Sequence, residues 1–261
     1  MEVLGYIALF VVGLVLGTLG GGGSILSVPI LVYLFSVDTV MASAYSLFIV
    51  GTTSLVGTWL KHNAQLVNLR TGVIFGVPSL LSIFCTRRWF VPALPDVIFQ
   101  TESLLLTKRA LILGVFAILM ILASVAIIRK KDRSHLVGEQ HPSALLILVG
   151  LFTGFLTGLV GAGGGFLIIP ALVYFTDIPF KSAVGTTLLI ITVNSLMGFM
   201  GDVMNYAINW HFLLSITSLA IVGIIVGTRS LVSLPTNILQ KAFGWFVMCM
   251  GTWILFREIF Y

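Results

Sequence analysis

The sequence predicts an all-α polytopic membrane protein made of two homologous repeats, each with a glycine-broken first helix. Three observations predict this fold class. Of 261 residues, 58% are hydrophobic and only 9% are charged, whereas a soluble domain carries about 25% charged residues. Apolar runs of about 20 residues, long enough to cross a bilayer as a helix, recur along the chain. The alternating pattern of barrel strands does not occur in the sequence, so helices are the structure that satisfies the backbone in lipid.

Eight apolar blocks follow one another, and two of them are too long for one helix. The blocks cover residues 3–36, 40–60, 70–87, 105–128, 143–176, 181–204, 210–230 and 237–257. Block 3–36 as a single helix would be about 50 Å long, but the hydrocarbon core is only about 30 Å thick. Glycine runs, which helix interiors tolerate poorly, interrupt the first and fifth blocks, and Pro29 and Pro170 follow them. We therefore expect broken helices or re-entrant hairpins there.

The two broken blocks belong to an internal duplication. A shift of 141 residues aligns 13–61 with 154–202 without a gap and places Gly20 on Gly161 and Pro29 on Pro170. Chance similarity between apolar segments would not keep glycine, proline and tyrosine in register. The sequence thus predicts a first transmembrane repeat over residues 1–128, a polar cytoplasmic linker over 129–142 and a second repeat over 143–261.

The distribution of basic residues bears on how the repeats are oriented. With the basic loop 129–133 inside, four crossings per repeat give parallel repeats and place seven Lys and Arg residues on each side of the membrane. If each broken block leaves the membrane on the side where it entered, the repeats are inverted, with nine inside and five outside. The positive-inside rule favours the inverted arrangement, which is also a common plan of membrane transporters.

Composition and motifs exclude several function classes. The net charge is +5, but the basic residues stand between apolar runs, so we expect no nucleic-acid partner. Cys85 and Cys249 lack the spacing of a metal site, and we expect no metal and no cofactor. Zinc-protease and serine-hydrolase motifs do not occur in the sequence, so we expect no catalytic residues and no enzyme.

The glycine breaks are the strongest candidates for a binding site. A helix that begins near Ser24 or Phe166 leaves its first N–H groups without intrahelical partners, and its N-terminus attracts negative charge. The alternative is that these glycines only let helices pack closely, as we expect for Gly13 and Gly17. The candidate backbone ligands of an anion are Gly20, Gly21, Gly22, Gly23, Ser24, Gly161, Gly163, Gly164 and Gly165.

The second helix of each repeat carries polar groups in an apolar setting. The candidate residues are Thr52, Thr53 and Ser54 in the first repeat and Thr186, Thr187 and Asn194 in the second. An amide or hydroxyl in lipid needs a hydrogen bond. That bond either completes the anion site or goes to the preceding helical turn or a neighbouring helix.

Charged side chains are expected at the ends of the spans. Arg87 and Arg88 end the third apolar block, and Lys61 and Asp202 end the second helix of each repeat. We interpret them as snorkelling or loop charges. Since no carboxylate is then deep in a span, an internal proton relay is not expected.

These motifs resemble the TauE/SafE sulfite exporter family. The resemblance rests on Gly13-x3-Gly17-x2-Gly20-x-Gly22-Gly23 before Pro29, and on its copy from Gly154 to Gly164 before Pro170. It implies a multi-pass permease of the plasma (inner) membrane with two related halves, linked with export or uptake of sulfite, sulfonates, thiosulfate and related small anions. One departure is Ala44-Tyr45-Ser46 in the first copy, where the second has Gly185-Thr186-Thr187, so the halves can contact a substrate unequally.

The leading hypothesis is a secondary transporter for a small sulfur-containing anion. The alternatives are an anion or small-solute channel, a carboxylate permease of the same fold, and a non-transporting membrane protein. The expected partners are the small anion and the lipid bilayer, and a homodimer stays open because glycine-rich faces can pack within one chain or between two.

Overall fold

The chain is an α-helical polytopic membrane protein, and each of the eight apolar blocks holds one helix or one pair of helices. The structure is a computed structural model that describes residues 2–62, 66–101, 104–129, 143–161, 163–176, 178, 180–230 and 236–260. The first half contains α1 (Glu2–Leu19), η1 (Gly21–Gly23), α2 (Ser24–Tyr33), α3 (Thr39–His62), α4 (Leu69–Cys85), η2 (Thr86–Phe90), α5 (Val91–Ala93), β1 (Val97–Thr101), β2 (Leu104–Thr107) and α6 (Lys108–Arg129). The second half contains α7 (Ser143–Val160), α8 (Gly165–Phe175), α9 (Phe180–Val203), α10 (Trp210–Ser230) and α11 (Thr236–Phe260). The predicted linker 129–142 lies outside the described residues, apart from Arg129.

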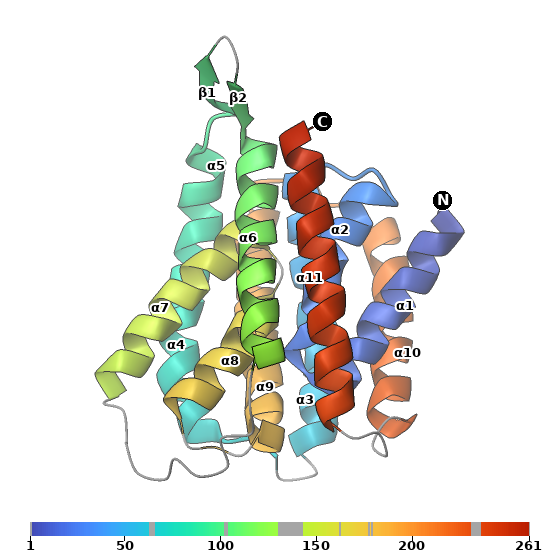
Figure 1. The fold of residues 1–261 in the computed structure, drawn as a ribbon, viewed down its shortest axis with the longest axis vertical. Helices are drawn as coiled ribbons and strands as arrows, with labels where there is room; N and C mark the ends of the chain where they lie inside the picture. Colours follow the sequence, from blue (N-terminus) through green and yellow to red (C-terminus); the bar gives the residue numbers. More distant parts are fainter. Residues whose placement is uncertain are drawn as a thin grey trace.

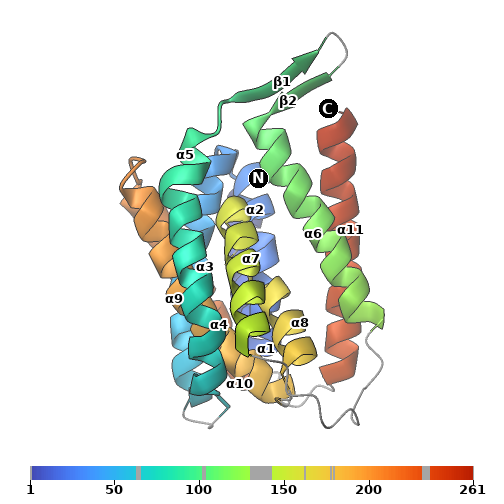
Figure 2. The ribbon, with the colours of Figure 1, turned by 90° about the vertical axis from the view of Figure 1, so that its left-hand side faces the viewer.

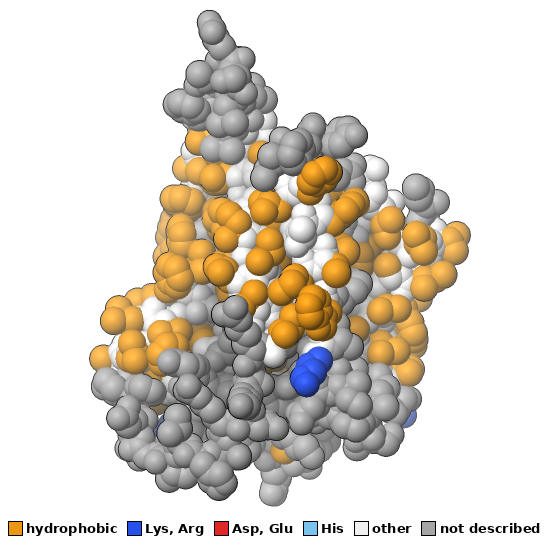
Figure 3. Space-filling view, in the orientation of Figure 1, with side chains coloured by type: hydrophobic (Ala, Val, Ile, Leu, Met, Phe, Trp, Pro, Cys, Tyr) orange, Lys and Arg blue, Asp and Glu red, His pale blue; other side chains and the backbone are white. Residues whose placement is uncertain are grey.

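Within the described segments, five helices are long and apolar enough to cross a membrane. They are Thr39–His62, Leu69–Ala93, Lys108–Val125, Ser182–Val203 and Trp210–Arg229. Large apolar side chains such as Trp59, Leu122 and Phe152 point outward, and Figure 3 shows hydrophobic side chains spread over the face of the bundle. Many serines and threonines are instead buried inside. This distribution suits a protein whose surroundings are lipid.

The termini and the two broken helices have a simple arrangement. Figures 1 and 2 show the N-terminus and the C-terminus at the same end of the bundle, which is the upper end in both views. From that end α1 descends to the glycine-rich η1, and α2 lies beside the upper end again. In the second half α7 rises from the lower end, and α8 lies in the lower part of the bundle (Figure 1).

The helices of the two halves pack against one another in a matching pattern. α1 packs on α10 as α7 packs on α4, and α2 lies on α3 as α8 lies on α9. α3 packs on α9 and α6 packs on α11, so each of these two contacts joins equivalent helices. Small residues allow the close approaches: a Cβ on Gly13 would overlap the Ala220 carbonyl, and a Cβ on Gly154 would overlap the Ser79 carbonyl.

Two features between α4 and α6 differ from the prediction. The third apolar block was expected to end at residue 87, but the helical path continues through the π-helical turn η2 and through α5 to Ala93. The fourth block was expected to begin at 105, but residues 97–107 form an antiparallel hairpin in which Phe99 pairs with Leu106. This hairpin extends beyond the ends of the helices (Figures 1 and 2).

Candidate anion-binding site

The two glycine breaks touch each other inside the bundle. We call residues 20–24 the first break and residues 161–165 the second break. A Cβ on Gly21 would overlap the backbone of Gly165, and a Cβ on Gly165 would overlap the backbone of Gly21. η1 and α2 both contact α8. The breaks, more than 100 residues apart in the sequence, therefore meet through bare backbone.

The first break is closely packed, and its Ser24 and the nearby Ser27 are hydrogen-bonded. A Cβ on Gly20 would be 2.7 Å from Val184 Cγ1, and one on Gly23 would overlap the Val12 carbonyl. Ser24 Oγ donates to the Gly21 carbonyl (2.7 Å). Ser27 Oγ donates to the Ser24 carbonyl (2.8 Å) and lies 2.5 Å from Ser46 Oγ. Close packing therefore explains why Gly20, Gly21 and Gly23 are glycines, without any contact to a ligand.

The second break has a left-handed backbone that favours glycine. Gly161, Gly163 and Gly164 have φ values of 75°, 68° and 70°, whereas in the first break only Gly20 is in this region, with φ 75°. Residues other than glycine adopt these φ values only at a cost in free energy. The three glycines let the chain pass from the end of α7 to the start of α8 in a conformation that few other sequences would hold.

Buried polar atoms without partners surround the second break. Arg87 Nη2 is the nearest atom to a Cβ built on Gly161, and Thr157 Oγ1 is the nearest to a Cβ built on Gly164. Ser195 Oγ is 3.0 Å from a Cβ built on Gly163. Among the described residues none of these three atoms has a hydrogen-bond partner. Buried polar atoms without a protein partner are uncommon, so these three are available to a small hydrogen-bonding ligand.

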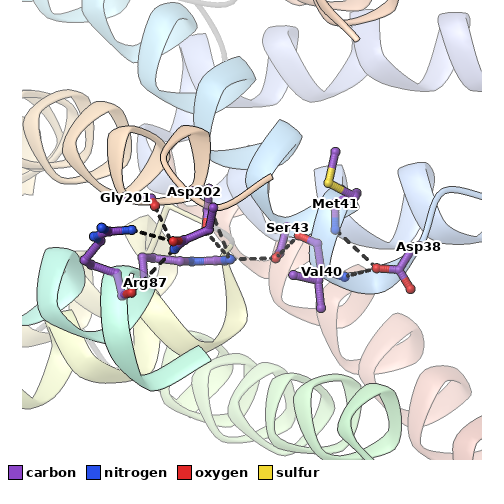
Figure 4. A network of polar contacts seen from close by, with 9 residues as sticks. Asp38, Val40, Met41, Ser43, Arg87, Gly201 and Asp202 are labelled. Atoms are coloured by element: carbon purple, nitrogen blue, oxygen red, sulfur yellow. Dashed lines mark hydrogen bonds and ion pairs between the residues drawn. The ribbon is translucent and has the colours of Figure 1, made fainter. Parts of the chain in front are cut away.

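Arg87 is buried next to the second break and forms an ion pair with Asp202. Both side chains are 0% exposed, and Arg87 Nη1 is 3.3 Å from Asp202 Oδ2 and 3.5 Å from Oδ1. The same nitrogen donates to Ser43 Oγ (2.9 Å), as Figure 4 shows. The interpretation of Arg87 and Asp202 as loop or snorkelling charges is therefore wrong. The helix continues past Arg87 through η2, and this brings its guanidinium into the interior.

The predicted hydroxyls divide into two groups. Thr52 donates to the Phe48 carbonyl (2.7 Å) and Thr53 to the Ile49 carbonyl (2.6 Å). Thr186 donates to the Ser182 carbonyl (2.7 Å) and accepts from the Asn68 N–H (2.9 Å). These three have the backbone partners that were the alternative to ligand contact. By contrast, Ser54 Oγ and Thr187 Oγ1 are buried and lack a hydrogen-bond partner in the described part of the chain.

Asn194 lies beside Ser195 on α9 and is completely buried. Its Nδ2 donates to Ser79 Oγ of α4 (2.6 Å). Its Oδ1 has no partner within the described segments. Of the sequence-predicted residues, the structure brings Gly161, Gly163 and Gly164 together with polar side chains, and Asn194 is next to one of those side chains along the chain.

Several residues of this region were not among the sequence-predicted ligands. They are Ser43, Arg87, Thr157, Ser195 and Asp202. A signal for four of them exists in the duplication, because Thr157, Ser43, Arg87 and Asp202 align with Leu16, Val184, Thr228 and Lys61. These are positions where the two repeats differ in polarity or charge. The second break therefore has Thr157 and Ser43 at positions where the first break has apolar residues, and an Arg and an Asp where the first has Thr and Lys.

The chain is similar to known proteins over nearly its whole length. A family model described as "Sulfite exporter TauE/SafE" matches residues 5–254. A "Probable membrane transporter protein" of Xylella fastidiosa is 28% identical over 95% of this chain and 92% of its own length. YunE of Bacillus subtilis, with the same description, is 24% identical over 98% of this chain and 100% of its own length.

A further relative matches a shorter part of the chain. MJ0441 of Methanocaldococcus jannaschii, also described as a probable membrane transporter protein, is 28% identical over 74% of this chain and 70% of its own length. No solved structure matches the chain. The family and the names of these relatives indicate membrane transport rather than catalysis. The chain belongs to the sulfite exporter TauE/SafE family.

Proposed function

We propose that this protein is a secondary transporter that moves a small sulfur-containing oxyanion, such as sulfite, thiosulfate or a sulfonate, across the plasma membrane. The family description and the names of the relatives support the coarse class, a membrane transporter. The observation that carries the proposed anion is a group of three buried polar atoms around the second break, Arg87 Nη2, Thr157 Oγ1 and Ser195 Oγ, which have no hydrogen-bond partner in the part of the chain that the structure describes.

The chemistry of this group suits an oxyanion. A guanidinium supplies charge and several N–H donors, and hydroxyls supply further donors. The first N–H groups of α8 lack acceptors within the helix, and the helix dipole adds positive potential at the same end. Each unsatisfied buried donor costs about 1–3 kcal/mol. An anion whose oxygens accept from several of them would recover much of that free energy.

The arrangement of the helices supports alternating access. In each half a broken helix packs against the long helices of the other half, and the broken helices meet at Gly21 and Gly165. In our proposal the halves are inverted repeats, and the rocking of one against the other exposes the site to the two sides in turn. Ser24 and the other candidates of the first break, with Ser54 and Thr187, then belong to the pathway next to the site.

A channel with the same constriction and a carboxylate permease are the rival functions. A transporter saturates at low substrate concentration and shows counterflow, since each cycle binds and releases substrate. A channel shows neither. The carboxylate permease shares this behaviour with the proposed function and differs only in the anion that it accepts.

The test combines binding and flux of the purified full-length protein. In thermal unfolding, thiosulfate, sulfite, methanesulfonate and acetate are compared. A ligand at 100 times its Kd stabilises the folded state by about 2.7 kcal/mol, and we expect stabilisation by sulfur oxyanions. In proteoliposomes we expect saturable uptake of the same anion, stimulated by unlabelled anion inside. Stabilisation by acetate alone would refute the substrate class, and flux without saturation or counterflow would show a channel.

A further inference from the structure

We propose that Arg87 is the cation that binds the transported anion, and that the release of Asp202 from Arg87 couples each bound anion to the uptake of one proton. This inference rests on the proposed function. It goes beyond it by naming the cation of the site and the coupling ion. The starting point is the buried ion pair of Arg87 and Asp202 (Figure 4). Arg87 Nη2 is the nearest atom to a Cβ built on Gly161, so the pair lies beside the second break.

The guanidinium of Arg87 has unused binding capacity. Nη1 serves both Asp202 and Ser43, while Nε and Nη2 have no partner in the described part of the chain. Arg87 is 0% exposed, so water in bulk solution does not compensate these N–H groups. Nη2 faces Gly161, the first glycine of the second break. An anion held at the second break therefore meets the free edge of the guanidinium.

Charge balance decides what happens to Asp202. The ion pair is neutral as a unit, and a bound anion places a second negative charge beside a single cation. A buried carboxylate that loses its cation binds a proton, because desolvation penalises its charged form. The proton comes from the aqueous phase and bonds to a carboxylate oxygen of Asp202. The loaded site then contains the Arg87 cation, the anion and a neutral carboxylic acid. With a monovalent anion its total charge is again zero, and with a divalent anion the proton lowers the excess negative charge from two to one.

Other titratable groups lie around the ion pair, but Arg87 is the cation that contacts Asp202. Tyr206, in the segment that follows α9, interacts with both Asp202 and Arg87, and burial raises its pKa above the usual value. Asp38 and Asp96 also act on Tyr206. Arg88 donates to Asn205 Oδ1 (2.5 Å) and to no carboxylate among the contacts of the described residues. Arg87 is thus the cation in direct contact with Asp202, and the loss of this contact leaves the carboxylate without an ion-pair partner.

The ion pair of Arg87 and Asp202 has no counterpart in the aligned positions of the other repeat. The repeat counterparts of Arg87, Asp202 and Ser43 are Thr228, Lys61 and Val184, and Val184 lies against Gly20 as Ser43 lies against Gly161. The first break therefore has no equivalent pair of an arginine and a carboxylate. One proton per transport cycle follows from this asymmetry.

The experiment measures binding of thiosulfate and methanesulfonate, which keep their charge, to the purified full-length protein from about pH 5 to pH 8. We expect anion binding by the wild-type protein to weaken as the pH rises. Where one proton is taken up per anion, the Kd should increase by up to about tenfold for each pH unit. Asp202→Asn should bind with a Kd that does not change with pH. Arg87→Gln should lose binding at every pH. Arg87→Gln/Asp202→Asn keeps a neutral hydrogen-bonded pair, serves as the folded control and should not bind.

Proton uptake by wild-type protein gives a second measurement that needs no variant. In weakly buffered detergent solution with an indicator dye, about one proton should disappear per anion bound. Binding without proton uptake, a pH dependence that persists in Asp202→Asn, or wild-type affinity in the folded double variant would overturn the inference and leave the proposed function standing. Failure of wild-type protein to bind any sulfur oxyanion would overturn the proposed function itself.

Discussion

The first and second breaks have the same glycine pattern but different surroundings. The first break faces Val184, and its Ser24 hydroxyl donates to the Gly21 carbonyl. The second break faces Arg87, Thr157 and Ser195, each with an atom that has no partner among the described residues. The difference teaches that the glycines supply a shape that both repeats share. Arg87 and Thr157 stand where the other repeat has Thr228 and Leu16, whereas Ser195 has an identical counterpart in Ser54.

Removal of Arg87 should be the largest perturbation. Arg87→Ala leaves the Asp202 carboxylate buried without its cation, and breaking a buried pair in this way costs about 3–5 kcal/mol. Thr228→Ala, at the counterpart position, should cost at most about 1 kcal/mol. Thermal unfolding in detergent measures both, and equal stabilities of the two variants would show that the halves do not differ as described.

Insertion of a methyl group between the breaks should have the next largest effect. Gly21→Ala places its Cβ against the backbone of Gly165, so the breaks must separate, and overpacking of this kind costs about 1–3 kcal/mol. Gly114→Ala in α6 is the control, because nothing lies within 4 Å of its Cβ and alanine favours a helix by about 0.5–1 kcal/mol. Unfolding midpoints that change equally in both variants would contradict the contact between the breaks.

Loss of one hydroxyl should distinguish the two breaks in binding. Ser195→Ala should weaken thiosulfate binding about tenfold, since a hydrogen bond to a charged group contributes about 1.5–3 kcal/mol. Ser54→Ala, in the equivalent position of the first repeat, should weaken it less. Ser124→Ala in α6, whose hydroxyl donates to the Ile121 carbonyl, should have no effect on affinity. Equal losses in Ser54→Ala and Ser195→Ala would mean that both breaks bind the anion.

The smallest effect is expected at Thr52. Its hydroxyl donates only to carbonyls of its own helix, so Thr52→Val should change stability by less than about 0.5 kcal/mol and leave affinity unaltered. Thr186→Val also removes the acceptor of the Asn68 N–H and should cost about 1 kcal/mol. A strong loss of thiosulfate affinity in Thr52→Val would show that Thr52 does contact the anion.

The positions of the helices were predicted well, because the length and apolar composition of each run indicate a membrane-spanning helix without reference to the rest of the chain. The eight blocks correspond to α1 with α2, α3, α4, α6, α7 with α8, α9, α10 and α11. The hairpin at residues 97–107 was missed, since it follows directly from a helix that was expected to end earlier and it overlaps the start of an apolar block. Its strands carry too few residues for a pattern of period two to stand out.

The candidate site was only partly visible in the sequence, because its contacts are between distant residues. The glycine runs identified the breaks, but nothing local links Arg87 to Asp202, which is 115 positions away. Both residues lie near the ends of apolar blocks, where charges normally reach water. The π-helical turn after Cys85 instead places Arg87 inside the bundle. Only the mismatches between the aligned repeats pointed to the residues that make the two breaks different.

The contact between Gly21 and Gly165 has a consequence for motion. Where two segments touch through interlocked side chains, sliding requires several rotamers to change together, and this raises the barrier. Here neither glycine has a side chain, so no rotamer has to change at this contact during the proposed rocking motion. The same tight contact leaves no room for a side chain or a water molecule between Gly21 and Gly165, so the line along which the proposed motion would occur is dry.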